Sequence, residues 1–399
     1  MVTFNSAMDV EALARSPVGK LVPISGIDAR WGSFSYFAFV PHPLPRSIPL
    51  REPTVRGVVD AGLALGRLDM AAKRVPNPAL LVRPALRKEA QSTSALEGTY
   101  APITEVLEGE IVGAESLSAE TREILNYVTA AEEGVRRLAE RPISLNMLAD
   151  LQSILVAGTR GETYDVGRLR ERHVMIGPKN EPIERARFVP PPDGDLLKAG
   201  VSDWERWIHD ESDVHLLVKV TLGHYQFEAL HPFSDGNGRL GRLIMTLQLI
   251  EAGVLGYPLL NIAEWLEPRK DEYIARLLQT SVTGDFDAWI AFLCRGIRDQ
   301  AGAAVDRIDR LVKVREDILD KVRIAGSRRG GATYRIADQL IGYPIIDVPT
   351  AAARQDVRYQ SANEAIKRLV SLGILREVRR SGRTRKIFLS QEVLNELNR

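Results

Sequence analysis

Apolar residues recur at three- and four-residue spacing along most of this chain, from Val55 to about Ala325. This spacing is typical of amphipathic helices, whose apolar side chains share one face. We predict helices over 118–140, 145–156, 216–230, 240–251, 271–278 and 286–322. Clusters of glycine and proline at 161, 177–182 and 190–194 interrupt the series and predict loops. The body of the chain is therefore expected to be mainly α-helical.

The two ends of the chain differ from this helical body. Residues 1–50 hold four prolines between Pro41 and Pro49 and an alternating aromatic stretch at 31–39, which predict an N-terminal arm with a strand or hairpin. At the other end, the sequence GSRRGG at 326–331 predicts a flexible linker. We therefore divide the chain into an arm (1–50), a helical domain (51–325) and a C-terminal domain (326–399).

Charge is distributed unevenly between these parts. The chain has 53 Lys and Arg against 52 Asp and Glu, a formal net charge of +1. Residues 326–399 contain 14 basic and 7 acidic residues, so this part carries +7 and the remainder carries 1 − 7 = −6. A small basic module on a mildly acidic body is typical of nucleic-acid binding, because contacts to phosphate supply most of the non-specific affinity.

A reducing, non-membrane location is expected. The single cysteine, Cys294, excludes an intramolecular disulfide, and the N-terminus lacks a basic stretch followed by an apolar run. The most apolar region, 243–263, contains Gln248, Glu251 and Pro258, which are unsuited to a membrane span. We expect a cytoplasmic protein with no membrane partner.

The densest cluster of chemically informative residues is HPFSDGNGRLGR, at 231–242, between two predicted helices. Gly236, Asn237 and Gly238 tolerate positive φ, so their backbone N–H groups can converge on an anion at a helix start. Arg239 and Arg242 share one face of the first helical turn. Two cations there oppose the helix dipole unless an anion binds, and guanidinium groups grip phosphate oxygens well. The cluster therefore predicts a polyphosphate site.

Two further residues of this cluster suit reaction chemistry. Asp235 offers a carboxylate beside the predicted anion, as Mg²⁺ prefers when it also binds substrate phosphates. His231 can accept a proton near neutral pH and could act as a general base. Taken singly, a His-Pro pair or a Gly-x-Gly turn is more often structural. Their combination within twelve residues argues against coincidence.

This cluster resembles the signature of the Fic family, HPFx(D/E)GNGRxxR, at every fixed position, and HYQFEAL at 224–230 is similar to the family's lead-in. The resemblance implies a Fic-type helical core, a catalytic domain over 51–325, and transfer of AMP from ATP to a Ser, Thr or Tyr hydroxyl with release of pyrophosphate. It implies that His231 deprotonates the hydroxyl, that Asp235 holds Mg²⁺, and that Phe233 packs the loop. The residues it assigns to nucleotide binding are Asp235, Gly236, Asn237, Gly238, Arg239, Leu240, Gly241, Arg242 and Tyr273, with the two arginines on the β- and γ-phosphates.

A second segment, TSALEG at 93–98, lies on a helix predicted near 84–98, with Pro84 at its start and Gly98 just past its end. Composition alone leaves Glu97 either solvated or paired with a distant cation. The segment is similar to the Fic family's inhibitory motif, (S/T)xxxE(G/N). That resemblance implies that Glu97 pairs with Arg242, blocks placement of the γ-phosphate and autoinhibits the enzyme, in cis or in trans.

The segment GRLRERHVMIG at 167–177 is similar to the family's flap, a short β-hairpin that positions the main chain of the target by adding a strand. The resemblance assigns this role to Val174, Met175, Ile176 and Gly177; the alternative is an ordinary surface hairpin. Tyr273 matches the first of two tyrosines on the adenine side of relatives. Ile274 and Ser281 depart from the family pattern, which leaves nucleotide selectivity open.

The C-terminal domain is predicted to contain helices around 334–340 and 350–355 and a third that starts at a capping box, Ser361 to Glu364. Two strands, 375–378 and 386–389, flank Ser381-Gly382, and six of the eleven residues at 376–386 are basic. Three helices and a basic hairpin resemble a winged helix-turn-helix domain. Such a domain implies DNA binding; a protein-interaction or dimer-forming module is the alternative.

The sequence thus predicts an autoinhibited protein adenylyltransferase. Two alternatives remain: a DNA-binding regulator that uses the Fic core as a nucleotide sensor, and a Fic enzyme that removes AMP or uses another nucleotide. The expected ligands and partners are ATP, Mg²⁺, a target protein with a hydroxyl side chain, the chain itself as a target, DNA at the C-terminal domain, and a second copy in a homodimer.

Overall fold

Helices dominate the computed structural model, which describes residues 7–112, 117–178, 180–211, 213–378 and 386–399. The helices are α1 (Val10–Ala14), α2 (Glu52–Lys73), α3 (Ala79–Leu96), α4 (Ile103–Val112), α5 (Ala119–Leu138), α6 (Leu145–Val156), α7 (Asp195–His209), α8 (Leu216–Leu230), α9 (Asn237–Glu251), α10 (Ile262–Leu266), α11 (Lys270–Thr283), α12 (Phe286–Ile324), α13 (Ala332–Asp338), α14 (Val348–Gln355), α15 (Tyr359–Ser371) and α16 (Gln391–Leu397), with 3-10 helices η2 (Ile183–Arg185) and η3 (Glu267–Arg269). The strands are β1 (Gly19–Asp28), β2 (Gly32–Pro41), β3 (Ile345–Ile346), β4 (Arg376–Val378) and β5 (Ile387–Leu389).

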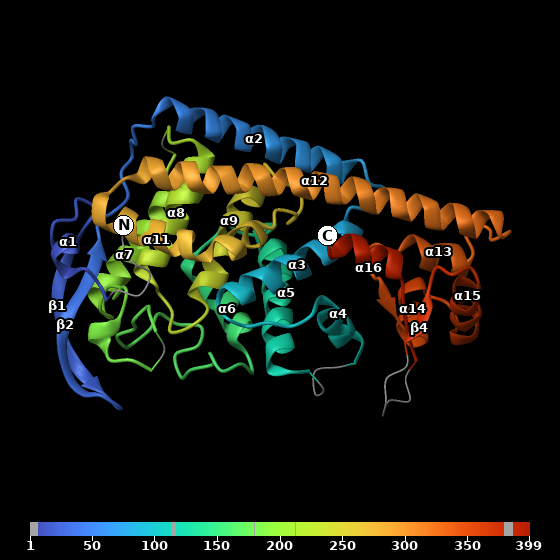
Figure 1. Cartoon of the computed structure of the whole chain (residues 1–399), viewed down its shortest axis with the longest axis horizontal. Helices are drawn as coiled ribbons and strands as arrows, with labels where there is room; N and C mark the ends of the chain where they lie inside the picture. The colour runs from blue at the N-terminus through green and yellow to red at the C-terminus, as the bar shows by residue number, and fades with distance from the viewer. Residues whose placement is uncertain (1–6, 113–116, 179, 212, 379–385) are drawn as a thin grey trace.

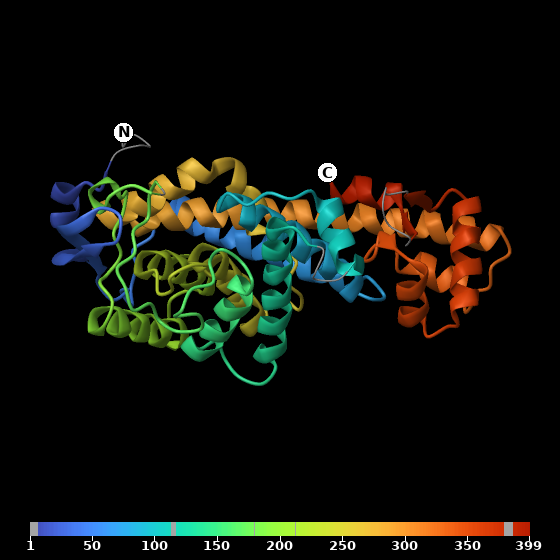
Figure 2. The same ribbon diagram turned by 90° about the horizontal axis from the view of Figure 1, so that it is seen from below.

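The molecule is elongated, and two long helices run along one side of it (Figures 1 and 2). Helices α2 and α12 lie side by side and run in the same direction. Arg51, just before α2, pairs with Asp287 near the start of α12, and Arg74, just after α2, pairs with Asp309 farther along α12. The β1–β2 hairpin lies at one end of the molecule and helices α13 to α16 at the other (Figure 1). Helices α8 and α9 lie between these ends, and most of their side chains are buried.

All six helices predicted from spacing are present, although some boundaries differ. The predicted start of the helix near 84–98 is wrong, because α3 begins at Ala79 and Pro84 lies inside it. Proline in a helix removes the hydrogen bond to the carbonyl four residues earlier. That carbonyl belongs to Leu80, and it lies so close to Gly342 that a Cβ there would be 2.8 Å from its oxygen. The start of α3 is thus packed against a distant segment.

The N-terminal aromatic stretch forms the second strand of a hairpin. Strands β1 and β2 pair antiparallel from Gly19 opposite Pro41 to Asp28 opposite Gly32. The hairpin joins the body through its main chain, because the Phe39 N–H donates to the Val189 carbonyl at 2.8 Å. The fold is mainly helical with small sheets, as expected.

Residues 332–378 and 386–399 form a module around a three-stranded sheet in the order β3-β5-β4. The predicted capping box is wrong: α15 begins at Tyr359, so Ser361 lies within the helix. The predicted linker at 326–331 is a short turn after which the chain packs back onto α12, where Arg310 pairs with Glu396 at 3.1 Å. Ser381-Gly382 and most of the basic stretch around it lie outside the described residues.

In the described part of the chain, the longer helices all carry too many polar or charged residues to cross a membrane.

Candidate active site

The loop between α8 and α9 carries the predicted signature, and its backbone bends at two points. His231 follows α8 as its C-cap in the left-handed region, with φ 49° and ψ 61°. Gly236 precedes α9 as its N-cap with φ 85°, which glycine adopts without strain. Asn237 fixes the turn, because its side chain donates to the Phe233 carbonyl at 2.7 Å and accepts from the Phe233 N–H at 2.9 Å. The Asn237 side chain is therefore used within the loop, and Phe233 is buried beneath it.

Arg170 holds this loop from outside the signature. Its buried guanidinium donates to the His231 carbonyl at 2.8 Å and to the Pro191 carbonyl at 2.5 Å, and its backbone N–H donates to the Pro232 carbonyl at 3.0 Å. The carbonyls at a helix C-terminus lack partners within the helix, and a cation satisfies them well. The sequence placed Arg170 in the flap segment but gave no signal for this role, because its partners are distant along the chain.

Asp165 is a second buried residue that sequence reasoning missed. Its carboxylate accepts the hydroxyl of Ser234 at 2.6 Å and the hydroxyl of Thr163 at 2.5 Å. Burial acts to raise the pKa of Asp165, but these hydrogen bonds outweigh it and hold the pKa below its ordinary value. Ser234 occupies a variable position of the signature, so no motif pointed to its partner.

His231 lies at the wall of the cavity in a form suited to accept a proton. Burial lowers the pKa of His231 to about 4, and the charge of Arg170 acts in the same direction. The ordinary value for histidine is about 6.5. The imidazole is therefore neutral at physiological pH, as a general base requires.

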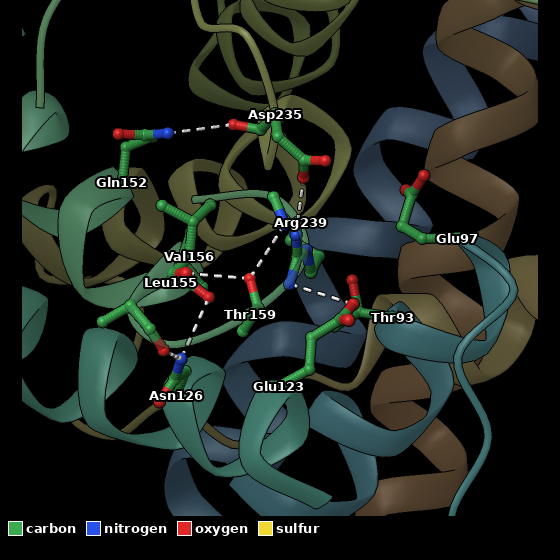
Figure 3. A network of polar contacts seen from close by, with 12 residues as sticks. Thr93, Glu97, Glu123, Asn126, Gln152, Leu155, Val156, Thr159, Asp235 and Arg239 are labelled. Carbon is green, nitrogen blue, oxygen red and sulfur yellow. Dashed lines mark hydrogen bonds and ion pairs between the residues drawn. The ribbon is translucent and has the colours of Figure 1, made fainter. Parts of the chain in front are cut away.

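Arg239 is enclosed by acidic side chains (Figure 3). Its Nη2 donates to Asp235 Oδ1 at 2.8 Å, and its Nη1 lies 3.0 Å from Glu123 Oε1. The sequence predicted that Arg239 and Arg242 leave positive charge for a polyphosphate to neutralise. In the structure, carboxylates of the chain already neutralise both arginines. A phosphate must therefore compete with these carboxylates.

Asp235 has the donor chemistry expected of a Mg²⁺ ligand. Its carboxylate is 45% exposed and lies where the loop enters α9. Mg²⁺ is usually bound by one or two carboxylates together with substrate phosphates and water. Within the described ranges, no group of three or more His, Cys, Asp or Glu side chains is arranged to hold a metal ion. Asp235 therefore fits a Mg²⁺ site that substrate phosphates complete.

Arg242 is held by the last turn of α3. Its Nη2 donates to Glu97 Oε1 at 2.6 Å, and its Nε donates to Thr93 Oγ1 at 2.6 Å. The Arg242 side chain is 2% exposed and that of Glu97 is 42% exposed. Burial acts to raise the pKa of Glu97, but the charge of Arg242 outweighs it and lowers the pKa. The ion pair expected between these two residues is present, and it forms within one chain.

Gly238 provides the space that the Glu97 carboxylate occupies. A Cβ on Gly238 would overlap Glu97 Oε1 and would lie 3.1 Å from Arg242 Nη1. The carboxylate therefore rests directly against the first turn of α9. This is the place where the anion-binding backbone was predicted.

A cavity of about 460 Å³ opens beside this ion pair. Of the predicted site residues, it is lined by His231, Gly238, Arg242, Tyr273, Ile176, Gly177 and Glu97. Among the described residues, the remaining predicted ones do not line it: Asp235, Gly236, Asn237, Arg239, Leu240, Gly241, Val174 and Met175. Leu240 is completely buried in the hydrophobic core, and the partly buried Met175 packs against the same core. Only some of the predicted site residues therefore line the cavity.

One wall of the cavity is aromatic and apolar. The Tyr273 hydroxyl lies 2.8 Å from His224 Nε2, and the two rings stack with centroids 6.0 Å apart. Ile274, Leu277 and Leu278 extend this wall. Ser281, the other departure from the family pattern, also lines the cavity, and its hydroxyl is 3.0 Å from that of Tyr225. Such a wall suits a planar, largely apolar group.

Glu228 also lines the cavity and was not predicted. Its Oε1 is buried and accepts no hydrogen bond from the described residues. Burial raises the pKa of Glu228 to about 7, although the charge of Arg242 opposes the shift. A Cβ on Gly241 would lie 2.7 Å from this oxygen, so Gly241 makes room for the carboxyl group.

The predicted flap is a loop closed by a single β-bridge. The Ile176 N–H donates to the Phe188 carbonyl at 2.9 Å, and the Phe188 N–H donates back to the Ile176 carbonyl at 3.1 Å. Ile176, Gly177, Arg187 and Phe188 line the cavity. The bridge therefore forms part of the cavity wall, and no longer hairpin is built from the described residues of this segment.

Two segments of the chain match known protein families. Residues 55–136 match the Fic/DOC family N-terminal region, and residues 142–249 match the Fic/DOC family itself. The Protein adenylyltransferase Fic of Drosophila ananassae is 29% identical over 187 residues, which cover 44% of this chain and 36% of that protein. A probable protein adenylyltransferase of Aquifex aeolicus is 32% identical over 89 residues, or 22% of this chain and 27% of that protein. The chain therefore aligns with about a third of the length of these relatives.

A solved structure shares the fold. The crystal structure of a Fic family protein from Desulfovibrio desulfuricans superposes with a TM-score of 0.55 at 19% identity, over 86% of this chain and 98% of that chain. At this identity the similarity concerns the arrangement of the helices.

Proposed function

Because this chain is a Fic/DOC family protein and a distant homologue of protein adenylyltransferases, we propose that it transfers AMP from ATP to a Ser, Thr or Tyr hydroxyl of a target protein or of itself. The observation that carries the proposal is the cavity in which a neutral His231, the first turn of α9 with Arg242, and an apolar wall with Tyr273 meet. The family implies the use of ATP. The binding of Mg²⁺, the nature of the target protein, and inhibition by Glu97, which we call the brake, are also part of the proposal.

The chemistry follows from these positions. The target hydroxyl gives its proton to the His231 imidazole as its oxygen attacks the α-phosphorus, and the bond to the pyrophosphate oxygen breaks. The backbone at Gly238 and the guanidinium of Arg242 stabilise the charge on the phosphates. Asp235 would hold the Mg²⁺ that neutralises the phosphates further. The flap around Ile176 would align the main chain of the target.

The contact between Glu97 and Arg242 supports an inhibited ground state. The carboxylate occupies the space beside Gly238 and neutralises the arginine proposed to hold a terminal phosphate. ATP must displace Glu97 to bind in a reactive position. Since the pair forms within one chain, the proposed inhibition acts in cis.

The test uses ATP labelled at the α-phosphate and, separately, at the γ-phosphate. Native protein, Glu97→Gly and His231→Ala are each incubated with MgCl₂ and the label found on protein is measured. We expect α-label on protein, faster with Glu97→Gly and absent with His231→Ala. Transfer of γ-label would indicate a kinase. No transfer by Glu97→Gly to itself or to lysate proteins would overturn the proposal.

We propose that residues 326–399 form a winged helix-turn-helix domain that binds duplex DNA. The support is the order α13-β3-α14-α15-β4-β5, in which three helices pack with a three-stranded sheet, and the net charge of +7. Retention of the full chain on duplex DNA that falls steeply with salt is expected. No retention at low salt would favour the protein-interaction alternative.

A further inference from the structure

Helix α2 has an apolar stripe on its outward side that none of the described residues covers. Its inner side, with Val58, Leu65 and Leu68, is buried against α12. Its outer side exposes four large apolar side chains: Val55 (45%), Val59 (54%), Leu63 (58%) and Met70 (60%). Their spacing of four, four and seven residues places them in one row along the helix. In Figure 1, α2 forms the upper border of the molecule.

Two glycines lie in the same row. A Cβ on Gly62 or Gly66 would meet no atom of the described residues within 4 Å, so their packing does not require a glycine at either position. Glycine in a helix interior costs about 1 kcal/mol relative to alanine. Glycines let a second helix approach the backbone closely. They therefore suit a crossing point in the middle of the row.

The charged residues beside the apolar row favour an antiparallel second copy of α2 as the partner. Asp60 and Arg67 are exposed on the same flank, and neither has an ion-pair partner among the described residues. In an antiparallel pair related by a two-fold axis, the same flanks face each other. An axis between Leu63 and Ala64 brings residue i opposite residue 127 − i, so Asp60 meets Arg67 of the second copy. In a parallel pair opposite flanks would face each other, so Asp60 would not meet Arg67.

We propose that α2 is the interface of a homodimer, in which two copies pack their apolar rows antiparallel and cross at Gly62 and Gly66. The charge order is self-complementary, which a two-fold dimer needs and an unrelated partner does not. Because the same patch is used by both copies, the assembly closes at two. The interface lies on α2, outside the cavity, and does not depend on the proposed reaction.

The test is a charge-reversal cycle on the full chain, followed by sedimentation velocity from about 1 to 100 μM. Native protein is expected to dimerise. Asp60→Arg and Arg67→Asp should each weaken the dimer by about tenfold or more, because like charges then face each other twice. The double variant should restore it. Leu63→Asp should give a monomer. Lys198→Glu, an exposed charge reversal on α7, should leave the dimer intact.

Three results would overturn the proposal. They are a monomer throughout the concentration range, a dimer that survives Leu63→Asp, and a double variant that stays as weak as the single ones. Far-ultraviolet circular dichroism checks that every variant is folded, and the labelled-ATP assay checks that the cavity is intact. A native monomer that associates only with another protein would likewise count against a homodimer.

Discussion

At position 231 the backbone and the side chain meet different requirements. A left-handed residue at a helix end is usually glycine or asparagine, and another residue there costs about 1 kcal/mol. His231 takes this conformation, and Arg170 binds its carbonyl. The bend ends α8 and places the imidazole on the cavity wall.

The pKa of His231 leads to a prediction about pH. We expect kcat/KM for AMP transfer by Glu97→Gly to stay constant from pH 8 to 6 and to fall only at lower pH. The reason is that burial lowers the pKa of His231 to about 4, and removal of the Glu97 charge, which raises it, moves it lower still. The measurement is the initial rate against pH at low ATP. An acid limb centred near 6.5 would contradict it.

Some residues of the site could be predicted from the sequence and others could not. His231, Gly238 and Arg242 lie within one short motif, so local spacing identifies them. Arg170 binds the His231 carbonyl and Asp165 binds the Ser234 hydroxyl, and each partner is more than sixty residues away along the chain. No local pattern encodes such contacts, because they depend on where the loops meet.

At the scale of single elements, α3 links the start of the chain's body to the site. Glu97 caps the helix and Gly98 follows with φ 92°, so the predicted end is confirmed. The start was mispredicted because Pro84 favours a first turn when only local preferences act. Packing of the first turn against Gly342 overrides that preference.

This element supports a prediction about stability. Glu97→Gly should lower the free energy of unfolding of the ligand-free protein by about 1–3 kcal/mol, because it leaves the buried Arg242 without a carboxylate. The half-exposed position of Glu97 keeps the loss below that of a fully buried pair. ATP with MgCl₂ should then raise the melting temperature of the variant more than that of the native protein.

Urea unfolding and thermal unfolding, each with and without ATP, measure these changes. Glu97→Gln, which keeps the shape and loses the charge, should fall between the two proteins. Equal stability of Glu97→Gly and native protein without ATP would show that Arg242 does not depend on Glu97.

At the scale of the whole molecule, the C-terminal module contacts the chain on both sides of Glu97. Before it, Arg83 of α3 donates to the Tyr343 hydroxyl at 3.1 Å, and Arg354 stacks on the same ring, 3.5 Å from its centroid. After it, Ile103 and Leu107 of α4 share an apolar cluster with residues of the module's sheet: Ile345, Ile387 and Leu389. The module therefore supports the segment that carries the proposed brake.

We expect Tyr343→Ala to loosen this support and to raise AMP transfer by the native chain. In a Glu97→Gly background the same substitution should change little, because the brake is already released. Such non-additivity identifies coupling between the two positions. The labelled-ATP assay on both backgrounds measures it, with Tyr359→Ala, an exposed tyrosine of α15, as the matched control. Equal effects in both backgrounds would refute the coupling.

The long helices could be predicted from the sequence, but the short elements and the way in which the elements pack together could not. Periodicity located α5, α6 and α12 closely, because each has a regular buried face. Strand β3 is two residues long and helix α16 seven. Such short elements depend on tertiary neighbours and leave no periodic trace.

Helix α12 has a consequence for anyone who wishes to divide the molecule. It is a single rod of about 58 Å at 1.5 Å per residue. Its first half is paired with α2 as far as Asp309. Its second half contacts α13 and α16 of the module, and Ile318 and Val322 are buried there. A chain truncated at residue 325 would keep the rod but strip its cover, leaving apolar side chains in water. Shortened versions are therefore expected to aggregate, and work on either part is best done on the intact protein.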